Sequence, residues 1–433
     1  MVMERTYVHC LKPGKTYTVM GWVDKLKNLG GLKFFRLKDR TGFVQVTGKK
    51  SDVSDYIFAL FDTLNKETCV QVSGKVVASK VAPGGKELVP EKMKVVNVAQ
   101  SPLPLETTDK IQSGMDTRFD YRFLDVRNPK VQAIMKVKDI VLTKTRDFLE
   151  SEGFIETHTP VIQAAGAEGG STLFSVDYYK GKAFLRQSPQ LYKQILMSSG
   201  LDRVYEIGPA FRAEKFHTSR HVSEFLSLDL EMAWIESMDD VLKLIEKMIV
   251  HITKGVGKDC KNELATLEVK DFKVPSTPFK RIEYSDGVDI LNKLGKKFKW
   301  GEDMMDVEEK IIGEQMTKKG HEWYFVTRFP SKLKPFYVMM DGKESHSYDL
   351  IYKGMEMASG GQREHRYDEL THVMKEKKLD PKDFKFYLDS FKYGMPPHGG
   401  MGFGVERLVQ KMLNLENIKE SILFPRTPDR LVP

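Results

Sequence analysis

Cysteine is scarce in this chain of 433 residues, which contains only Cys10, Cys69 and Cys260. They are widely separated and form no CxxC pair, so the sequence argues against a disulfide framework and a cysteine-rich zinc site. Long hydrophobic runs are also missing, since no stretch approaches the roughly 18 apolar residues of a membrane span. The charged residues 1–15 lack the apolar core of a signal peptide. We therefore expect a cytoplasmic protein without a membrane partner.

Charged and apolar side chains are both plentiful. The 68 Lys and Arg residues exceed the 60 Asp and Glu residues, which gives a formal net charge of +8, and 41% of all residues are hydrophobic. At about 100–200 residues per domain, the length predicts two or three domains with cores of their own. The positive balance suits a polyanion such as nucleic acid, but an ordinary solvated surface explains it equally well.

Residues 1–100 are typical of a β-rich module. Short stretches of β-branched and aromatic residues, separated by Gly or Asp, predict strands, and apolar residues at helical spacing predict one helix over 53–65. Strands around a single helix in a segment of this size indicate a small closed barrel of the OB type, a common platform for oligonucleotides. The predicted strands cover 17–23, 32–37, 43–47 and 70–77.

Residues 101–120 contain two prolines and little periodicity, which predicts a linker before a larger domain over 121–433. An apolar stripe predicts a long helix over 131–153, ended by Gly153. Short apolar runs joined by loops favour an α+β domain with an antiparallel sheet over a doubly wound one. The Lys-rich segment 255–320 is interpreted as an insertion. The runs expected to be strands are 184–186, 204–207, 225–232, 323–327 and 336–340.

The segment 203–231 is the first of three that carry candidate chemistry. It is interpreted as a strand, a polar loop and a second strand. The planar fork of Arg212 suits a carboxylate or phosphate, and Phe225 suits stacking on a flat base. Asp229 and Glu231 share one strand face and are costly to bury unless cations or a ligand satisfy them. The alternative is a surface hairpin with ion pairs across its strands.

Two further segments carry glycines and acids. The glycine-rich run 398–404 leads into a helix that contains Arg407, and glycines and a helix N-terminus both favour close approach of an anion. The βαβ context of a dinucleotide-binding loop is missing. In the third segment, Asp349 and Glu356 suit Mg²⁺ and Arg363 suits a carboxylate, although acids in a Lys-rich chain are commonly just solvated.

In this order, the three segments resemble the motifs of class II aminoacyl-tRNA synthetases. Arg212 with the loop to Phe225 is similar to motif 2, residues 402–407 are similar to motif 3, and the 131–153 helix leading to Pro160 is similar to the dimer-forming motif 1. Residues 21–23 and 39–46 resemble the OB anticodon-binding domain of the subclass for Asp, Asn and Lys. The resemblance covers nearly the whole chain and implies a homodimer that binds tRNA.

Within this subclass, residues 186–194 resemble the signature of the aspartyl enzymes, in which Gln190 and Lys193 face the substrate. Lys193 and Arg363 together place two cations around one carboxylate, which favours L-aspartate as the substrate. The lack of a Lys-rich N-terminal extension and of a large inserted domain makes the compact archaeal type the most similar. An asparaginyl enzyme and a non-catalytic paralogue that binds RNA or an amino acid stay open as alternatives.

The resemblance also implies individual roles. Arg212 bridges the α-carboxylate of aspartate and the α-phosphate of ATP, Phe225 stacks on adenine, and Arg407 holds the γ-phosphate, so Arg212 and Arg407 are the candidate catalytic residues. The other implied contacts are Glu168, Gln190, Lys193, Asp229, Ser359 and Arg363 with aspartate; Glu214, Arg220, His221, Glu356 and Gly404 with ATP; Asp349, Glu356 and Ser359 with Mg²⁺; and Phe34 and Gln45 with the anticodon.

The implied reaction has two steps. Aspartate attacks ATP to give aspartyl-adenylate and pyrophosphate, and the terminal adenosine hydroxyl of the tRNA then takes the acyl group. Positioning and cationic side chains carry the first step, because the attacking carboxylate needs no base. In the archaeal type, a Trp after Gly-Trp-Val and a Lys before the last barrel strand are associated with discrimination between the aspartate and asparagine tRNAs. Asp24 and Pro83 stand there in this chain, which predicts a relaxed choice.

Overall fold

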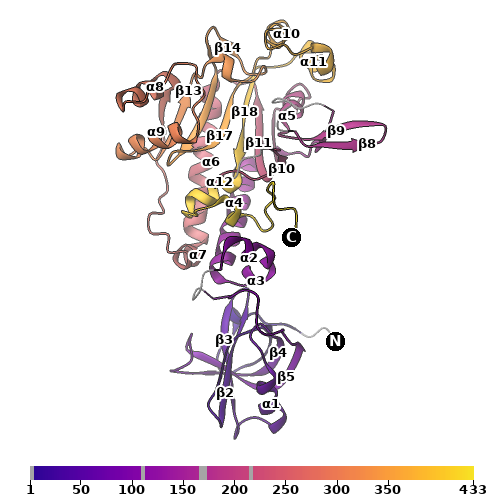
Figure 1. Ribbon diagram of the computed structural model, residues 1–433, viewed down its shortest axis with the longest axis vertical. Coiled ribbons are helices and arrows are strands. Elements are labelled where there is room, and N and C mark those ends of the chain that lie inside the picture. Colours follow the sequence, from indigo (N-terminus) through magenta and orange to yellow (C-terminus); the bar gives the residue numbers. More distant parts are fainter. Residues whose placement is uncertain (1–3, 109–112, 165–172, 214–217) are drawn as a thin grey trace. The chain divides into compact units, whose positions relative to one another are not determined.

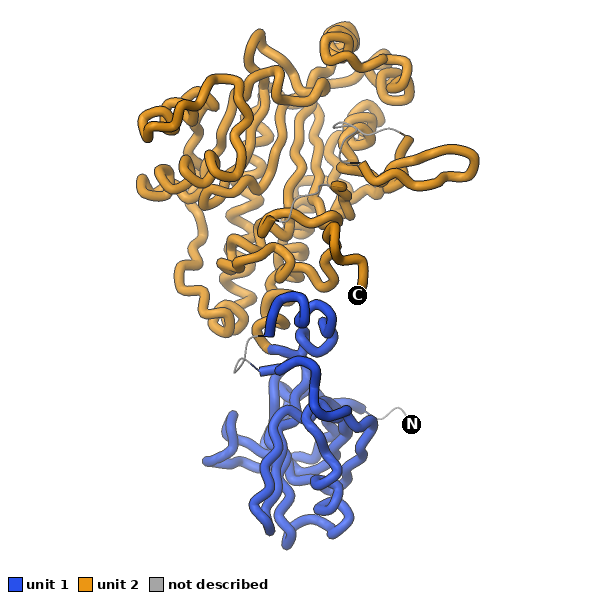
Figure 2. The backbone as a smooth tube through the Cα atoms, in the orientation of Figure 1, with its two compact units in different colours: residues 1–128 blue, residues 129–433 orange. Residues whose placement is uncertain are grey.

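The computed structural model describes residues 4–108, 113–164, 173–213 and 218–433. The chain divides into two compact units, residues 1–128 and 129–433 (Figure 2). Of the helices in the described residues, none is both long enough and apolar enough to cross a membrane.

Unit 1 is built around a closed five-stranded barrel with strand order β1-β2-β3-β5-β4 (Figure 1). Alternation along the strands separates the two faces of the barrel, so Phe35 and Leu37 are fully buried while Phe34 lies on the opposite face of β2. The OB-type barrel predicted from the sequence is confirmed. Its strands are β1 (Thr16–Asn28), β2 (Leu32–Asp39), β3 (Gly42–Lys49), β4 (Cys69–Ala78) and β5 (Lys86–Asn97), and β5 was not among the predicted strands.

Short helices complete unit 1. Helix α1 (Asp55–Leu60) begins at Ser54, whose hydroxyl accepts a hydrogen bond from the Ile57 amide, and it continues into the 3-10 turn η2 (Phe61–Thr63). The turn η1 (Val8–Cys10) precedes the barrel. The predicted linker over 101–120 differs from the structure, because it contains α2 (Met115–Asp120) and is followed by α3 (Arg122–Asp125) within the same unit.

Unit 2 is organised by an eight-stranded sheet with order β12-β13-β16-β17-β18-β11-β10-β6. The six strands from β13 to β10 are antiparallel, and the two edge strands β12 and β6 pair in parallel. This mixed sheet confirms the α+β class. The strands are β6 (Ile155–Glu156), β10 (Arg203–Phe211), β11 (Glu224–Ala233), β12 (Lys280–Glu283), β13 (Trp323–Thr327), β16 (Ser347–Tyr352), β17 (Met355–Gln362) and β18 (His398–Gly404).

Two long helices cover one face of this sheet (Figure 1). Helix α4 (Pro129–Ser151) and helix α6 (Met238–Asp259) pack on each other through apolar stripes and share one hydrophobic core with β10, β11, β17 and β18. The predicted helix over 131–153 corresponds to α4. The remaining helices are α5 (Gln190–Met197), α7 (Lys261–Thr266), α8 (Tyr284–Lys293), α9 (Asp306–Lys318), α10 (Tyr367–Glu376), α11 (Lys385–Lys392) and α12 (Val405–Met412), with the 3-10 turns η4 (Ser331–Leu333), η5 (Pro381–Phe384) and η6 (Ile418–Ser421).

Two expectations for this unit need correction. The run 184–186 overlaps β9 (Gly181–Leu185), which pairs with β7 (Ile162–Gln163) and β8 (Ser175–Tyr178) in a separate small sheet. The run 336–340 is mostly irregular and reaches only the two-stranded ribbon of β14 (Met340–Asp341) and β15 (Glu344–Ser345). The segment 255–320, interpreted as an insertion, contains β12, which forms one edge of the main sheet.

Candidate functional site

A cavity of about 430 Å³ opens against the sheet of unit 2. Strands β11, β13, β16, β17 and β18 and helices α5, α9 and α12 all contribute to its lining. The structure thereby brings together side chains as distant in the sequence as Gln187 and Ile418. Of the predicted site residues, those that line the cavity are Gln190, Arg212, Arg220, His221, Phe225, Asp229, Asp349, Glu356, Ser359, Arg363, Gly404 and Arg407.

Arg212 and Phe225 form one wall. Strands β10 and β11 are antiparallel, with Ala210 opposite Phe225, and the Arg212 amide donates to the Ser223 carbonyl at 2.9 Å. The Arg212 guanidinium lies 5.6 Å from the centre of the Phe225 ring. This wall therefore offers a planar cation beside a flat aromatic face, which suits an anion attached to a planar ring.

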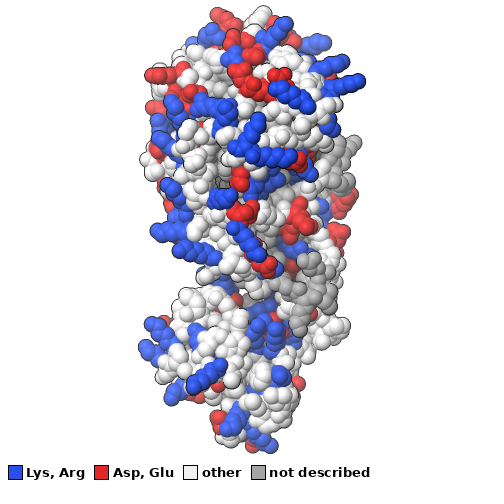
Figure 3. Space-filling model, turned by 90° about the vertical axis from the view of Figure 1, so that its left-hand side faces the viewer, with Lys and Arg blue, Asp and Glu red and all other residues white. Residues whose placement is uncertain are grey.

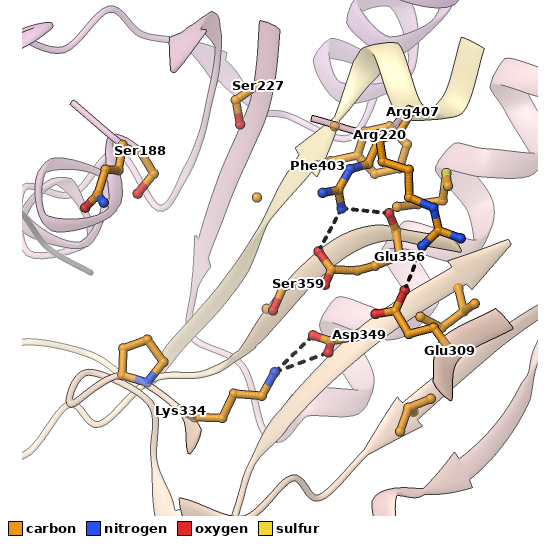
Figure 4. Close-up of a pocket in the computed structure, with 18 of the residues that line it drawn as sticks. Ser188, Arg220, Ser227, Glu309, Lys334, Asp349, Glu356, Ser359, Phe403 and Arg407 are labelled. Carbon is orange, nitrogen blue, oxygen red and sulfur yellow. Dashed lines mark hydrogen bonds and ion pairs between the residues drawn. The ribbon is translucent and has the colours of Figure 1, made fainter. Parts of the chain in front are cut away.

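Three carboxylates, those of Glu309, Asp349 and Glu356, also line the cavity (Figure 4). Each has a cationic partner: Lys334 lies 3.1 Å from Asp349, Arg407 lies 3.3 Å from Glu356, and Arg220 lies 3.5 Å from Glu309. Burial, followed by repulsion from Glu356 and Asp349, raises the pKa of Glu309 to about 8. Burial also raises the pKa of Asp349, although Lys334 opposes this.

Burial is the largest cause of both raised pKa values, and the neighbouring carboxylate of Glu356 adds to each. Asp349 of β16 and Ser359 of β17 are cross-strand partners, so their side chains lie at the same edge of the cavity. Among the described residues, no three acidic, His or Cys side chains come together as a complete metal cage. Mg²⁺ takes one or two carboxylates and fills its other positions with water and phosphate oxygens, so the set fits Mg²⁺ bound together with a phosphate ligand.

Behind the cavity wall lies a buried cluster of four charges: Lys193, Asp229, Glu231 and Arg363. The Lys193 ammonium donates to Asp229 Oδ1 at 2.9 Å and to the Met401 carbonyl at 2.8 Å, and it lies 3.5 Å from Glu231. Arg363 Nε donates to Glu231 Oε1 at 2.9 Å. Burial opposes ionisation of Glu231, yet Arg363 and Lys193 hold the pKa of Glu231 below its usual value.

This cluster changes the expectation for Lys193. We predicted that Lys193 and Arg363 place two cations around the side-chain carboxylate of the substrate. Asp229 and Glu231 balance them, so the cluster of two cations and two anions is formally neutral. Arg363 and Asp229 line the cavity, whereas Lys193 does not and contacts Asp229 from behind.

Glycines in β18 allow this cluster to form. A Cβ atom on Gly400 would collide with the Leu230 carbonyl and with the Glu231 carboxylate. The run 398–404 is the central strand β18, between β17 and β11. His398 at its start is fully buried, with Nδ1 2.8 Å from the Pro396 carbonyl and Nε2 3.0 Å from Gln194, so it has a packing role.

Arg220 and His221 lie beside the carboxylates. Arg220 contacts Asp306 at 3.1 Å and the Gly354 carbonyl at 3.4 Å in addition to Glu309. His221 Nδ1 lies 2.6 Å from Thr218 Oγ1. Two other predicted contacts, Glu168 and Glu214, lie outside the described residues.

Sequence reasoning missed two charged residues of the site, Glu309 and Lys334. Glu231 was singled out with Asp229 as an acid that needs cations when buried, and Lys193 and Arg363 are those cations. Glu309 lies in the amphipathic helix of the segment that was interpreted as an insertion. Lys334 follows η4 in an irregular stretch, where no periodicity identifies it.

The barrel of unit 1 exposes a polar and aromatic face. Phe34 is half-buried with the Lys27 ammonium 6.0 Å from its ring, and the Arg36 guanidinium lies 4.3 Å from the ring of Phe43. Gln45 is opposite Arg36 in β3 and donates to Thr47 at 3.1 Å. Stacking rings beside cations and an amide are the groups that bind unpaired bases.

The two residues predicted to influence tRNA choice differ in their surroundings. Pro83 is exposed in the turn between β4 and β5. Asp24 is buried and forms an ion pair with Arg36, so it holds the side chain that lies opposite Gln45.

Two family models match the chain. Residues 114–428 match the class II tRNA synthetases (D, K and N), and residues 17–96 match the OB-fold nucleic acid binding domain. The Aspartate--tRNA(Asp) ligase of Pyrococcus abyssi is 49% identical over 424 residues, which are 97% of each chain. The Aspartate--tRNA(Asp/Asn) ligase of Methanopyrus kandleri is 45% identical over 98% of this chain and 97% of its own.

Solved structures give a similar result. The asparaginyl-tRNA synthetase of Pyrococcus horikoshii, complexed with asparaginyl-adenylate, matches with a TM-score of 0.94 at 36% identity and covers 100% of both chains. The aspartyl tRNA synthetase of Entamoeba histolytica matches with a TM-score of 0.87 at 28% identity, over 100% of this chain and 93% of its own.

Proposed function

Because the chain belongs to the class II tRNA synthetases (D, K and N), we propose that it ligates L-aspartate to tRNA at the expense of ATP. The observation that carries the choice of aspartate is the 49% identity, over 97% of both chains, to an aspartate-tRNA ligase. The reaction proceeds through aspartyl-adenylate: a carboxylate oxygen of aspartate attacks the α-phosphorus, the bond to the β-phosphate breaks, and pyrophosphate leaves.

The cavity supports this chemistry through its fixed charges. Phe225 receives the adenine ring, and Arg212 neutralises the charge that develops between the attacking carboxylate and the α-phosphate. Arg407, in the first turn of α12, holds the far end of the triphosphate. Positioning and charge stabilisation then account for the rate of adenylate formation, because the attacking carboxylate needs no general base.

Asp349 and Glu356, with Ser359 beside them, would hold Mg²⁺. When bound, the ion would offset the charge of the phosphates. The support is that Asp349, Glu356 and Ser359 line the same cavity, with Asp349 opposite Ser359 across β16 and β17. Lys334 and Arg407 meanwhile keep Asp349 and Glu356 oriented toward the cavity.

The amino group and side chain of aspartate would contact Gln190, Asp229 and Arg363. Arg363 meets the side-chain carboxylate, while Asp229 faces the α-ammonium. Lys193 fixes Asp229 from behind through its 2.9 Å contact. Ligation of asparagine is the second candidate, and the formal neutrality of the buried cluster favours it, since a neutral amide needs no surplus cation.

For tRNA, we propose that Phe34 stacks on an anticodon base and that Gln45 reads a base edge. A relaxed choice between the aspartate and asparagine tRNAs belongs to the same proposal, because Pro83 offers no charge at the exposed turn and Asp24 is occupied with Arg36. A homodimer is proposed from the resemblance of α4 and the residues after it to motif 1.

One experiment tests the central proposal. ATP-pyrophosphate exchange is measured with aspartate and asparagine side by side, and both tRNAs are then offered to the same preparation. Exchange driven by aspartate is the expected result. Exchange driven only by asparagine would establish the second candidate, and a folded protein without exchange would establish a non-catalytic paralogue. Light scattering of the pure protein measures the oligomeric state.

A further inference from the structure

A second cavity, of about 660 Å³, lies on the far side of Arg220. Its lining contains five cationic side chains and two acidic ones, Glu314 and Glu416, which leaves a formal surplus of three positive charges. Figure 3 shows that Lys and Arg side chains are frequent on the face of residues 129–433 that carries α8 and α9. We call this space the basic cavity, and its cations are Arg220, Lys310, Lys318, Lys353 and Lys411.

Most of these cations are not neutralised. Within the described part of the chain, neither Lys310 nor Lys318 nor Lys411 has a carboxylate partner, and Lys353 alone of the four lysines forms an ion pair, with Asp271 at 2.7 Å. The half-buried Lys411 donates to the Lys353 carbonyl at 3.3 Å. Burial lowers the pKa of Lys411, and Arg220, Lys353 and Lys310 lower it further. An anion in the cavity would relieve this repulsion.

The basic cavity and the first cavity are lined by the same two helices and share Arg220. Helix α12 directs Arg407 to the first cavity and, one turn later, Lys411 to the second. Helix α9 does the same with the consecutive residues Glu309 and Lys310. Arg220 lines both spaces and is held between them by Asp306, Glu309 and the Gly354 carbonyl.

We propose that the basic cavity is a second anion site, which takes pyrophosphate as it leaves the first cavity past Arg220. The inference rests on the proposed function, since that reaction supplies the pyrophosphate. The lysines of the basic cavity come from α9, from α12 and from the turn between β16 and β17. A compact anion with several charges matches such a group better than a singly charged ligand does. When Arg220 moves away from Glu309, a path opens between the two cavities. The Arg220 guanidinium then stays paired with the departing pyrophosphate.

The first test is direct binding to the full chain. Inorganic pyrophosphate is titrated calorimetrically into protein whose first cavity is filled with a non-hydrolysable ATP analogue. We expect one bound pyrophosphate, about tenfold weaker binding in Lys411→Met, and no change in Lys319→Met. Lys319 is exposed and lines neither cavity, so it controls for loss of a charge. Methionine preserves the apolar stem of Lys411, which limits damage to packing.

Three results would overturn the proposal: no binding beside the analogue, equal binding by Lys411→Met, or equal affinity for inorganic phosphate. The second test measures exchange kinetics, in which Lys411→Met is expected to raise the KM for pyrophosphate about tenfold and leave the KM for ATP unchanged. A rise in the KM for tRNA alone would identify a tRNA phosphate as the occupant and would overturn the assignment. If aspartate-dependent exchange is absent but Lys411-dependent binding persists, the proposed function fails and the anion site stands.

Discussion

Replacing Lys193 by methionine removes one cation from a buried cluster that is formally neutral. The ammonium donates to Asp229 at 2.9 Å and to the Met401 carbonyl at 2.8 Å, and it lies 3.5 Å from Glu231. The variant keeps Arg363 against two carboxylates, so the cluster acquires a charge of −1 beside the proposed site for aspartate. Removing one partner of a buried ion pair costs about 3–5 kcal/mol of stability.

The effect on substrate binding follows from the same charge. At a distance of about 5 Å and an effective dielectric constant of about 20, one uncompensated negative charge repels a carboxylate by about 3 kcal/mol. The KM for aspartate is therefore expected to rise by about two orders of magnitude. The KM for ATP should stay unchanged, because Arg212, Phe225 and Arg407 are left in place.

Exchange kinetics with titrated aspartate and ATP measure both effects, and circular dichroism selects a temperature at which the variant is folded. The double variant Lys193→Met/Glu231→Gln pairs one cation with one anion and should recover about tenfold of the loss. Lys144→Met removes a lysine that pairs with Asp147 at 3.1 Å, away from the cavity, and should leave both KM values unchanged. An unchanged KM for aspartate in folded Lys193→Met, or an equal rise for ATP, would refute the reasoning.

Three other predictions concern stability and tRNA. Burial lowers the pKa of His398 to about 4, so between pH 6.5 and pH 4 the unfolded chain binds a proton that the folded chain does not. Stability should fall by about 3 kcal/mol across this window, and a pH series of thermal melts should show a shallower slope for His398→Gln. Gly400→Ala places a methyl group against the Leu230 carbonyl and Glu231, so its melting transition should reveal a loss of at least about 1–3 kcal/mol, and an unchanged transition would contradict the close approach. Phe34→Ala should raise the KM for tRNA about tenfold through lost stacking, with exchange kinetics unaffected, and equal charging at low tRNA concentration would remove Phe34 from the interface.

Local patterns in the sequence determined much of this protein. Alternating β-branched residues predicted four of the five barrel strands, and the apolar stripe of residues 131–153 predicted α4, because both depend on periodicity within a short segment. The same holds for the resemblance to synthetase motifs, whose short spans contain Arg212, Phe225 and Arg407. Strand β5 was missed because its Lys and Glu residues dilute the alternation.

Only the tertiary structure decided which charged residues, distant from one another in the sequence, form ion pairs. Lys193 was predicted to face the substrate's carboxylate, yet Asp229 and Glu231 of strand β11 balance its charge and that of Arg363. Glu309 joins Asp349 and Glu356 only because α9 packs beside β17. The glycine-rich run 398–404 suggested close approach of an anion, but at Gly400 the close neighbours are the Leu230 carbonyl and the Glu231 carboxylate of β11. Electrostatic energy depends on distance and burial, and neither can be read from spacing along the chain.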